Sequence, residues 1–196
     1  MYRLFDFLIL ILVAPIIVPL FLCVLFLAIV IHRKSFFFVQ YRHGVDKRVF
    51  KLYKFRTMIV GAQNIGTGLH SYPGDFRVTR LGKFLRITSL DELPQIFNII
   101  KGDMTFVGPR PAVLGELEFE TDLPADIDLR FSVRPGLTGW AQIHGRDNLS
   151  WNEKAVLDIE FVKFKGISRF LVFTYILFYT PFYLLNFSVT YEKKRN

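Results

Sequence analysis

Cysteine is nearly absent from this sequence. Cys23 is the only cysteine among 196 residues, and it lies within an apolar run. A disulfide framework is therefore excluded, together with any cluster of thiolate ligands for zinc. Histidine is also scarce, and its four positions show no metal-ligand spacing: His32, His43, His70 and His144. We expect no zinc site, and we expect Cys23 to be a small buried hydrophobic residue.

Two nucleotide-binding signatures are missing as well. Neither a Walker A phosphate loop nor the glycine-rich dinucleotide fingerprint occurs, which argues against P-loop and Rossmann sites. Acidic residues are in the minority, 17 against 25 Lys and Arg, so the net charge is +8 and the pI is near 9.7. Nucleic acid, anionic lipid and phosphorylated substrates all suit such a balance. Because the basic residues are dispersed and no binding module is recognisable, we expect no nucleic-acid partner.

Hydrophobic residues, in contrast, are abundant. They make up 52% of the chain, 22 of them are Phe, and the mean hydropathy is +0.32. Charged residues still account for 21%, so a lipid-facing part and a water-facing domain must coexist. We divide the chain into an N-terminal membrane hairpin (1–33), a globular domain (34–168) and a C-terminal apolar, membrane-associated segment (169–196).

The N-terminal run, residues 4–31, is apolar except for Asp6. It is too long for the apolar core of a signal peptide, and as a helix it could cross about 30 Å of hydrocarbon once. Pro15 and Pro19 lie near its middle, where each removes a backbone donor. One straight or kinked transmembrane helix is the first interpretation of this run.

Positive charge at both ends of the run favours a second interpretation. Arg3 precedes the run, and residues 32–34 (His-Arg-Lys) follow it. Because positive charge marks the cytoplasmic side, a helix that enters the membrane, bends at Ala14-Pro15 and returns satisfies both ends. The C-terminal run, residues 170–189, also has basic flanks. For it we favour helices at the membrane surface over a second crossing.

The globular domain contains a strand and a helix that carry charged residues. Residues 49–58 are rich in aromatic and β-branched types and predict a strand with Lys54 and Arg56 on one face. Apolar residues at helical spacing predict a helix that ends at Gly102, with Ser89 and Glu92 as a capping box. Asp91 and Glu92 would then lie in the first turn, where the helix dipole stabilises an ionised carboxylate.

This carboxylate pair has two interpretations. In the structural interpretation, the two acidic residues only cap a helix, as acidic residues commonly do. An Asp held ionised is also an available nucleophile or metal ligand, and adjacent helical residues point about 100° apart, so the two carboxylates would take different roles. Residues 108–111 (Gly-Pro-Arg-Pro) place Arg110 on a stiff loop suited to phosphate, and residues 134–146 add two more arginines. A basic set around one carboxylate pair is typical of phosphoryl transfer.

These motifs, in this order and spacing, resemble the bacterial sugar transferase family, the monotopic phosphoglycosyl transferases. The resemblance extends from the N-terminal run to about Lys165, and the chain resembles the small members of the family. It implies an α+β fold, mostly helical with a small β element, a re-entrant membrane helix-break-helix and interfacial helices. The resemblance rests on five motifs: residues 53–58 (YKFRTM), 89–95 (SLDELPQ), 101–104 (KGDM), 108–111 (GPRP) and 134–139 (RPGLTG).

The resemblance also implies a reaction. Asp91 would attack the β-phosphate of a UDP-sugar, UMP would leave, and polyprenyl phosphate would take the phosphosugar from the aspartyl intermediate. Glu92 would bind Mg²⁺ or manage the proton, and Arg110 would hold phosphate. Further phosphate contacts are expected from Lys54, Arg56 and Arg146. The expected location is the cytoplasmic face of the bacterial inner membrane, in contact with its lipids. The reaction would be the first membrane step of polysaccharide assembly.

Two departures from the family pattern concern the membrane segments. The family often has Ser-Pro at the helix break, where this chain has Ala14-Pro15, and the C-terminal run is more apolar than usual. The alternative function is that of a non-enzymatic, membrane-anchored basic binding protein. The sequence does not identify the sugar, which loops 61–74 and 116–130 are expected to select, and it leaves homo-oligomerisation open.

Overall fold

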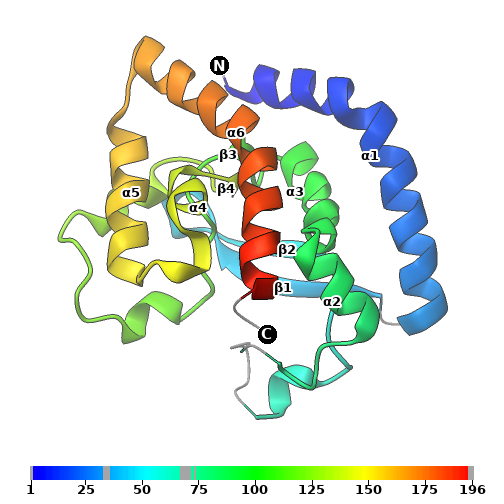
Figure 1. The fold of residues 1–196 in the computed structure, drawn as a ribbon. Coiled ribbons are helices and arrows are strands. Elements are labelled where there is room, and N and C mark those ends of the chain that lie inside the picture. Colours follow the sequence, from blue (N-terminus) through cyan, green and yellow to red (C-terminus); the bar gives the residue numbers. More distant parts are fainter. Residues whose placement is uncertain (1, 33–35, 67–71, 73, 194–196) are drawn as a thin grey trace.

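The computed structural model describes residues 2–32, 36–66, 72 and 74–193, so Arg33 and Lys34 of the predicted basic flank lie outside the described residues. The fold is α+β and mostly helical, with two small two-stranded sheets, as predicted (Figure 1). Its helices and strands are α1 Tyr2–His32, β1 Phe37–His43, β2 Val49–Phe55, α2 Arg80–Ile87, α3 Ile96–Lys101, β3 Thr105–Val107, β4 Gly136–Thr138, α4 Trp140–His144, α5 Trp151–Lys163 and α6 Gly166–Lys193.

The predicted strand exists but is shorter than expected. β2 pairs with β1 as an antiparallel hairpin from Phe37↔Phe55 to His43↔Val49, and it ends at Phe55 rather than Met58. Beyond it, Met58 forms an isolated bridge with Val78 because the chain there has left the hairpin for a different partner.

The second sheet brings two of the sequence motifs together. β3 and β4 are parallel, and Gly108, which follows β3, donates its N–H to the carbonyl of Thr138 at 2.8 Å. A Cβ on Gly136 would stand 2.1 Å from the nitrogen of Gly108, and a Cβ on Gly139 would stand 2.1 Å from its oxygen. The glycines of both motifs are therefore required by the close approach of two backbones.

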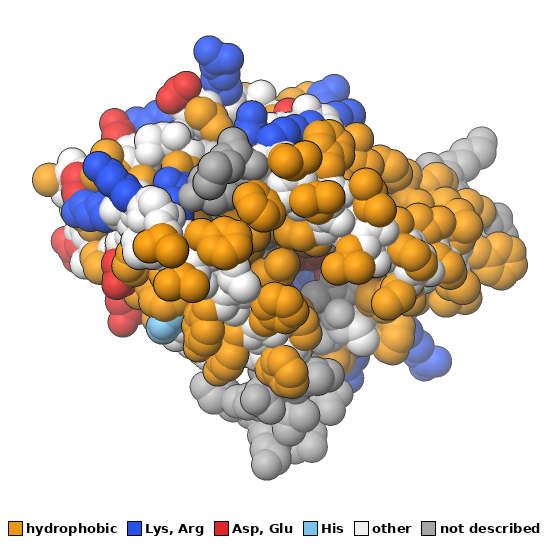
Figure 2. Space-filling view, turned by 90° about the horizontal axis from the view of Figure 1, so that it is seen from above, with side chains coloured by type: hydrophobic (Ala, Val, Ile, Leu, Met, Phe, Trp, Pro, Cys, Tyr) orange, Lys and Arg blue, Asp and Glu red, His pale blue; other side chains and the backbone are white. Residues whose placement is uncertain are grey.

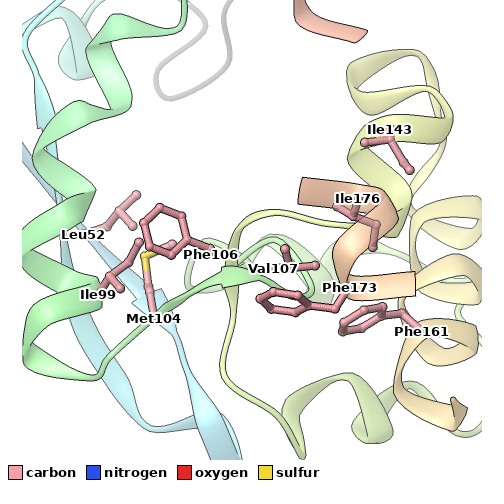
Figure 3. Packing of buried hydrophobic residues seen from close by; sticks show 9 residues of the cluster. All are labelled: Leu52, Ile99, Met104, Phe106, Val107, Ile143, Phe161, Phe173 and Ile176. Atoms are coloured by element: carbon pink, nitrogen blue, oxygen red, sulfur yellow. The ribbon is translucent and has the colours of Figure 1, made fainter. Parts of the chain in front are cut away.

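The main core is built on both faces of β3. Successive strand residues point to opposite sides, so Phe106 and Val107 enter different halves of one cluster (Figure 3). The helix α6 contributes to the second half, since Phe173 and Ile176 are 5% and 0% exposed. One face of the C-terminal apolar segment is thus part of the core of the globular domain. The cluster consists of Leu52, Ile99, Met104, Phe106, Val107, Ile143, Phe161, Phe173 and Ile176.

The long helix α1 contains both Pro15 and Pro19 and bends partway along its length (Figure 1). Its beginning is attached to the globular domain by polar groups. Arg3 donates to the carbonyls of Ile99 and Ile100. Asp6, which is fully buried, accepts a hydrogen bond from the Thr105 hydroxyl at 2.7 Å and one from the Phe106 N–H at 3.1 Å.

The second half of α1 returns to the same domain. Val24 and Ala28 pack in a second core cluster with Phe55 of β2 and Leu85 of α2. Cys23, next to them, is exposed, so the prediction that it is buried was wrong. The neighbouring Val24 takes the inward position of this helical face instead.

The outer surfaces of α1 and α6 are apolar. Over residues 3–31 and 166–184, both helices are long and apolar enough to cross a membrane. Seen from above, apolar side chains cover a broad face of the molecule (Figure 2). The exposed apolar side chains of α1 and α6 include Leu4, Ile11, Leu12, Ile16, Phe26, Ile167, Leu171, Phe178 and Phe182. An apolar face of this extent indicates a protein localised at a membrane.

Candidate active site

Asp91 and Glu92 lie in a short 3₁₀ segment, Leu90–Gln95, and α3 begins only at Ile96. The predicted capping box was wrong, because Ser89 has a left-handed backbone (φ 56°) and its side chain makes no cap bond. Pro94 explains why the segment is not α-helical, since it has no N–H to donate in an α-helical hydrogen bond. The predicted stop at Gly102 is confirmed, with φ 92° and its N–H directed to the carbonyls of Asn98 and Ile99.

Glu92 is clamped between two cations from distant parts of the chain. Its Oε1 accepts from Lys54 Nζ at 2.8 Å and from an Arg110 guanidinium nitrogen at 3.2 Å. The Glu92 side chain is 11% exposed. Burial alone would raise the pKa of Glu92, but the charges of Lys54, Arg110 and Arg146 outweigh it and hold the pKa well below its usual value of 4.5. Glu92 is therefore an ionised anchor of the site.

Asp91 behaves in the opposite way. Burial, reinforced by repulsion from Glu92, raises its pKa above the usual 3.8 against the opposing charges of Lys54, Arg86 and Arg146. Asp91 lies in a 3₁₀ segment of six residues and not in the first turn of an extended α-helix, so the helix position on which the expected dipole stabilisation depended is not formed. Two adjacent carboxylates with pKa values moved apart are typical of a site in which each has a separate chemical role.

Four of the predicted basic residues are placed in different ways. Lys54 and Arg110 bind Glu92, and Arg146 is close enough to affect the pKa of both carboxylates. Arg56 donates instead to the carbonyl of Phe37 at 3.1 Å. β2 ends at Phe55, so the strand geometry that was to place Arg56 beside Lys54 no longer applies there.

Three further arginines that sequence reasoning missed support the site. Arg86 acts on the pKa of Asp91 and donates to the Thr57 hydroxyl at 2.8 Å. Arg42 donates to the carbonyl of Pro111 at 2.7 Å, and Arg130 to the carbonyl of Arg110 at 2.8 Å. Two carbonyls of the loop formed by residues 108–111 are thus held by guanidinium groups.

The support for that loop is itself buried. Arg130 forms an ion pair with Asp158 of α5 at 2.8 Å, and both side chains are 2% exposed. Burial and the neighbouring charge of Arg110 lower the pKa of Arg42 to about 10. The only advance signal for these arginines is that Arg86 lies five residues before Asp91 in the sequence.

The raised pKa of Asp91 predicts a pH effect. The expected role of Asp91 as a nucleophile requires its ionised form, so the acidic limb of kcat/KM should lie above pH 3.8. Arg86→Gln removes a cation that lowers this pKa, so the limb should move to higher pH. Arg80→Gln, an exposed change on the same helix, should leave it in place. An identical limb in both variants would show that Arg86 does not control the ionisation of Asp91.

The carboxylates present suit Mg²⁺. Across the described residues, no three His, Cys, Asp or Glu side chains come together as a ligand cluster. Mg²⁺ nevertheless binds through one or two carboxylates and completes its shell with water and phosphate oxygens. Asp91 and Glu92 supply that donor set, although Oε1 of Glu92 already accepts from two cations.

A family model described as bacterial sugar transferase matches residues 1–186. The chain therefore belongs to the bacterial sugar transferase family.

Curated relatives agree with this assignment. The uncharacterized sugar transferase EpsL of Bacillus subtilis is 44% identical over 126 residues, 64% of this chain and 59% of that protein. A UDP-glucose:undecaprenyl-phosphate glucose-1-phosphate transferase of Escherichia coli is 41% identical over 162 residues, 80% of this chain and 34% of that protein. An undecaprenyl-phosphate galactose phosphotransferase of Salmonella typhimurium is 39% identical over 136 residues, 62% of this chain and 27% of that protein. The chain spans less than two thirds of each relative.

Proposed function

We propose that this protein transfers a sugar-1-phosphate from a UDP-sugar to polyprenyl phosphate and releases UMP. The observation that carries the proposal is the carboxylate pair itself. Glu92 is neutralised and held by Lys54 and Arg110, while Asp91 beside it is partly exposed and more basic than usual. The named activities of the Escherichia coli and Salmonella relatives are of this class.

The chemistry proceeds in two displacements at phosphorus. An oxygen of ionised Asp91 attacks the β-phosphate of the donor, and the bond from that phosphorus to the oxygen bridging to UMP breaks. UMP leaves with that oxygen and the electron pair. A phosphate oxygen of the polyprenyl acceptor then attacks the aspartyl phosphosugar, which frees the Asp91 carboxylate and gives a polyprenyl diphosphate-sugar. Covalent catalysis of this form divides one difficult transfer into two easier ones.

The basic residues neutralise phosphate charge during both steps. Arg110, on its supported loop, presents a guanidinium suited to two phosphate oxygens, and Arg146 lies near both carboxylates. Lys54 holds Glu92 in place, and Arg56 is the weaker candidate because its side chain turns toward β1. Mg²⁺, held by Glu92 with Asp91 beside it, would offset the negative charge of the diphosphate.

The attachment of α1 supports a re-entrant helix on the cytoplasmic side. Arg3 and Asp6 hold its beginning on the globular domain, and Val24 and Ala28 hold its second half on the same domain. A helix held at both ends by one water-facing body has both ends on one side of the membrane. Positive charge near its ends favours the cytoplasm for that side, where nucleotide sugars are made.

Labelling of single cysteines tests this topology. In a Cys23→Ser background, a cysteine added in a short polar tag before residue 1 and Lys83→Cys should both react with an impermeant maleimide in inverted membrane vesicles and not in intact spheroplasts. Lys83 is exposed on α2. A tag cysteine labelled in spheroplasts, with Lys83→Cys protected, would mean that α1 crosses the membrane once.

The activity is tested with the full chain in nanodiscs, polyprenyl phosphate and a panel of UDP-sugars. We expect UMP release and a lipid diphosphate-sugar with at least one donor, loss of both on addition of EDTA, and recovery with excess Mg²⁺. Activity that persists in EDTA would remove Mg²⁺ from the proposal. Binding of anionic membranes without turnover of any donor would favour the non-enzymatic binding protein.

A further inference from the structure

A cavity of about 700 Å³ lies apart from the Asp91 site. Three arginines from separate parts of the chain line it, namely Arg48, Arg134 and Arg169, and Asp103 is the one carboxylate in its lining. It lies at the Val49 end of β2, five residues along the strand from Lys54. At about 3.3 Å per residue, that distance is roughly 16 Å. The cavity is therefore not part of the carboxylate site.

The charge of the lining is positive. Arg48 and Arg134 are exposed, and within the described ranges neither side chain has an ion pair or a hydrogen bond. Arg169 lies over the Phe161 ring at 5.3 Å. Asp103 accepts from the Asn98 amide at 3.3 Å. Three guanidinium groups against one carboxylate leave a net charge suited to an anion, and guanidinium groups match phosphate oxygens in particular.

The other walls of the cavity are apolar. Phe161 and Phe173 line it from α5 and α6, where both belong to the core cluster. The Phe5 and Phe170 rings are 5.6 Å apart, so α1 and α6 begin side by side, and Arg169 at the beginning of α6 lines the cavity. Figure 1 shows the N-terminus close to the first turns of α6. Next to Arg169, the side chains of Ile167 and Leu171 are 77% and 61% exposed.

We propose that this cavity binds the phosphate diester of an anionic membrane lipid, with an acyl chain along the exposed apolar start of α6. Cationic walls at the level where two apolar helices begin are suited to a headgroup at the membrane surface. A zwitterionic lipid carries its own cation, which the arginines repel, so net charge decides the preference. The bound lipid holds the start of α6 at headgroup depth. The proposal rests on the membrane placement of the protein and not on its transferase activity.

Native mass spectrometry of the full chain in detergent tests the proposal. The protein is titrated with phosphatidylglycerol and phosphatidylcholine of identical acyl chains, and inorganic phosphate is used as a competitor. Arg48→Gln with Arg134→Gln is compared with Arg80→Gln with Lys83→Gln, which removes two exposed charges from α2. Each cation near an anionic lipid contributes about fivefold to affinity, so the cavity variant should lose about 30-fold for phosphatidylglycerol.

The expected result is a preference for phosphatidylglycerol that the α2 variant retains and the cavity variant loses. Arg48→Lys with Arg134→Lys keeps the charge and should restore most of the binding. The structure places Arg134 in the lining of this cavity, and not in the basic set around the carboxylate pair to which the sequence assigned it. Equal adducts of both lipids, equal loss in both glutamine variants, or displacement of the lipid by millimolar inorganic phosphate would each overturn the lipid site.

Discussion

Asp91→Asn should abolish turnover, with a loss of about 10⁴-fold or more, because the amide cannot form the phosphosugar ester. With a reactive donor and no acceptor, intact mass measurement should show a phosphosugar adduct on the wild type and none on the variant. The variant should also be more stable than the wild type at neutral pH. Folding raises the pKa of Asp91, so its ionised form is disfavoured in the folded state, and an uncharged Asn removes this cost.

The expected gain in unfolding free energy distinguishes the loss of a catalytic group from structural damage to the site. An inactive variant that melts earlier than the wild type would indicate a structural role for Asp91. A wild type that makes product without any adduct, together with an active Asn variant, would mean direct transfer from donor to acceptor. Denaturant unfolding at neutral pH, with turnover measured on the same preparations, distinguishes these outcomes.

Glu92→Gln should have the second largest effect. It removes the counter-charge that holds Lys54 and Arg110, so we expect kcat/KM to fall by about 10²- to 10⁴-fold. Breaking a buried ion pair from one side leaves uncompensated charge, which should cost about 3 kcal/mol of unfolding free energy at pH 7. Glu120→Gln, an exposed change in a loop, should alter neither quantity.

The stability difference should depend on pH in one direction. The pKa of Glu92 is lowered in the folded state, so its contribution is fully present above its ordinary value of 4.5. It is lost as pH falls through the folded pKa. The gap in unfolding free energy between wild type and Glu92→Gln should therefore be largest near neutrality and narrow below pH 4.5. A gap that is constant from pH 7 to pH 4 would contradict the depressed pKa.

Local sequence signals predicted much of the frame of this site. Aromatic and β-branched residues predicted the strand before Phe55, and Gly102 ended α3 where expected because only its left-handed backbone allows that stop. The capping box predicted from Ser89 and Glu92 was wrong, because Pro94 prevents an α-helical turn at Asp91. A four-residue pattern does not show which of two competing local rules wins.

The contacts that complete the site depend on the tertiary fold. Lys54 and Glu92 are 38 residues apart in the chain, and the strand pattern predicted the same role for Lys54 and Arg56. Because β2 ends at Phe55, the Lys54 side chain binds the Glu92 carboxylate, whereas the Arg56 side chain binds the backbone of β1. Arg42 and Arg130 were missed because an arginine that binds a backbone carbonyl leaves no recognisable partner in the sequence.

The double attachment of α1 has a consequence for protein engineering. Val24 and Ala28 cover Phe55 and Leu85, so the membrane helix also serves as a wall of the core that supports β2. A version truncated before residue 36 would expose that wall to water and leave the hydroxyl of Thr105 without its carboxylate partner Asp6. Replacing the first 32 residues by an unrelated anchor would have the same result. The enzyme and its anchor are thus a single folding unit, and detergents or nanodiscs suit its preparation better than deletion does.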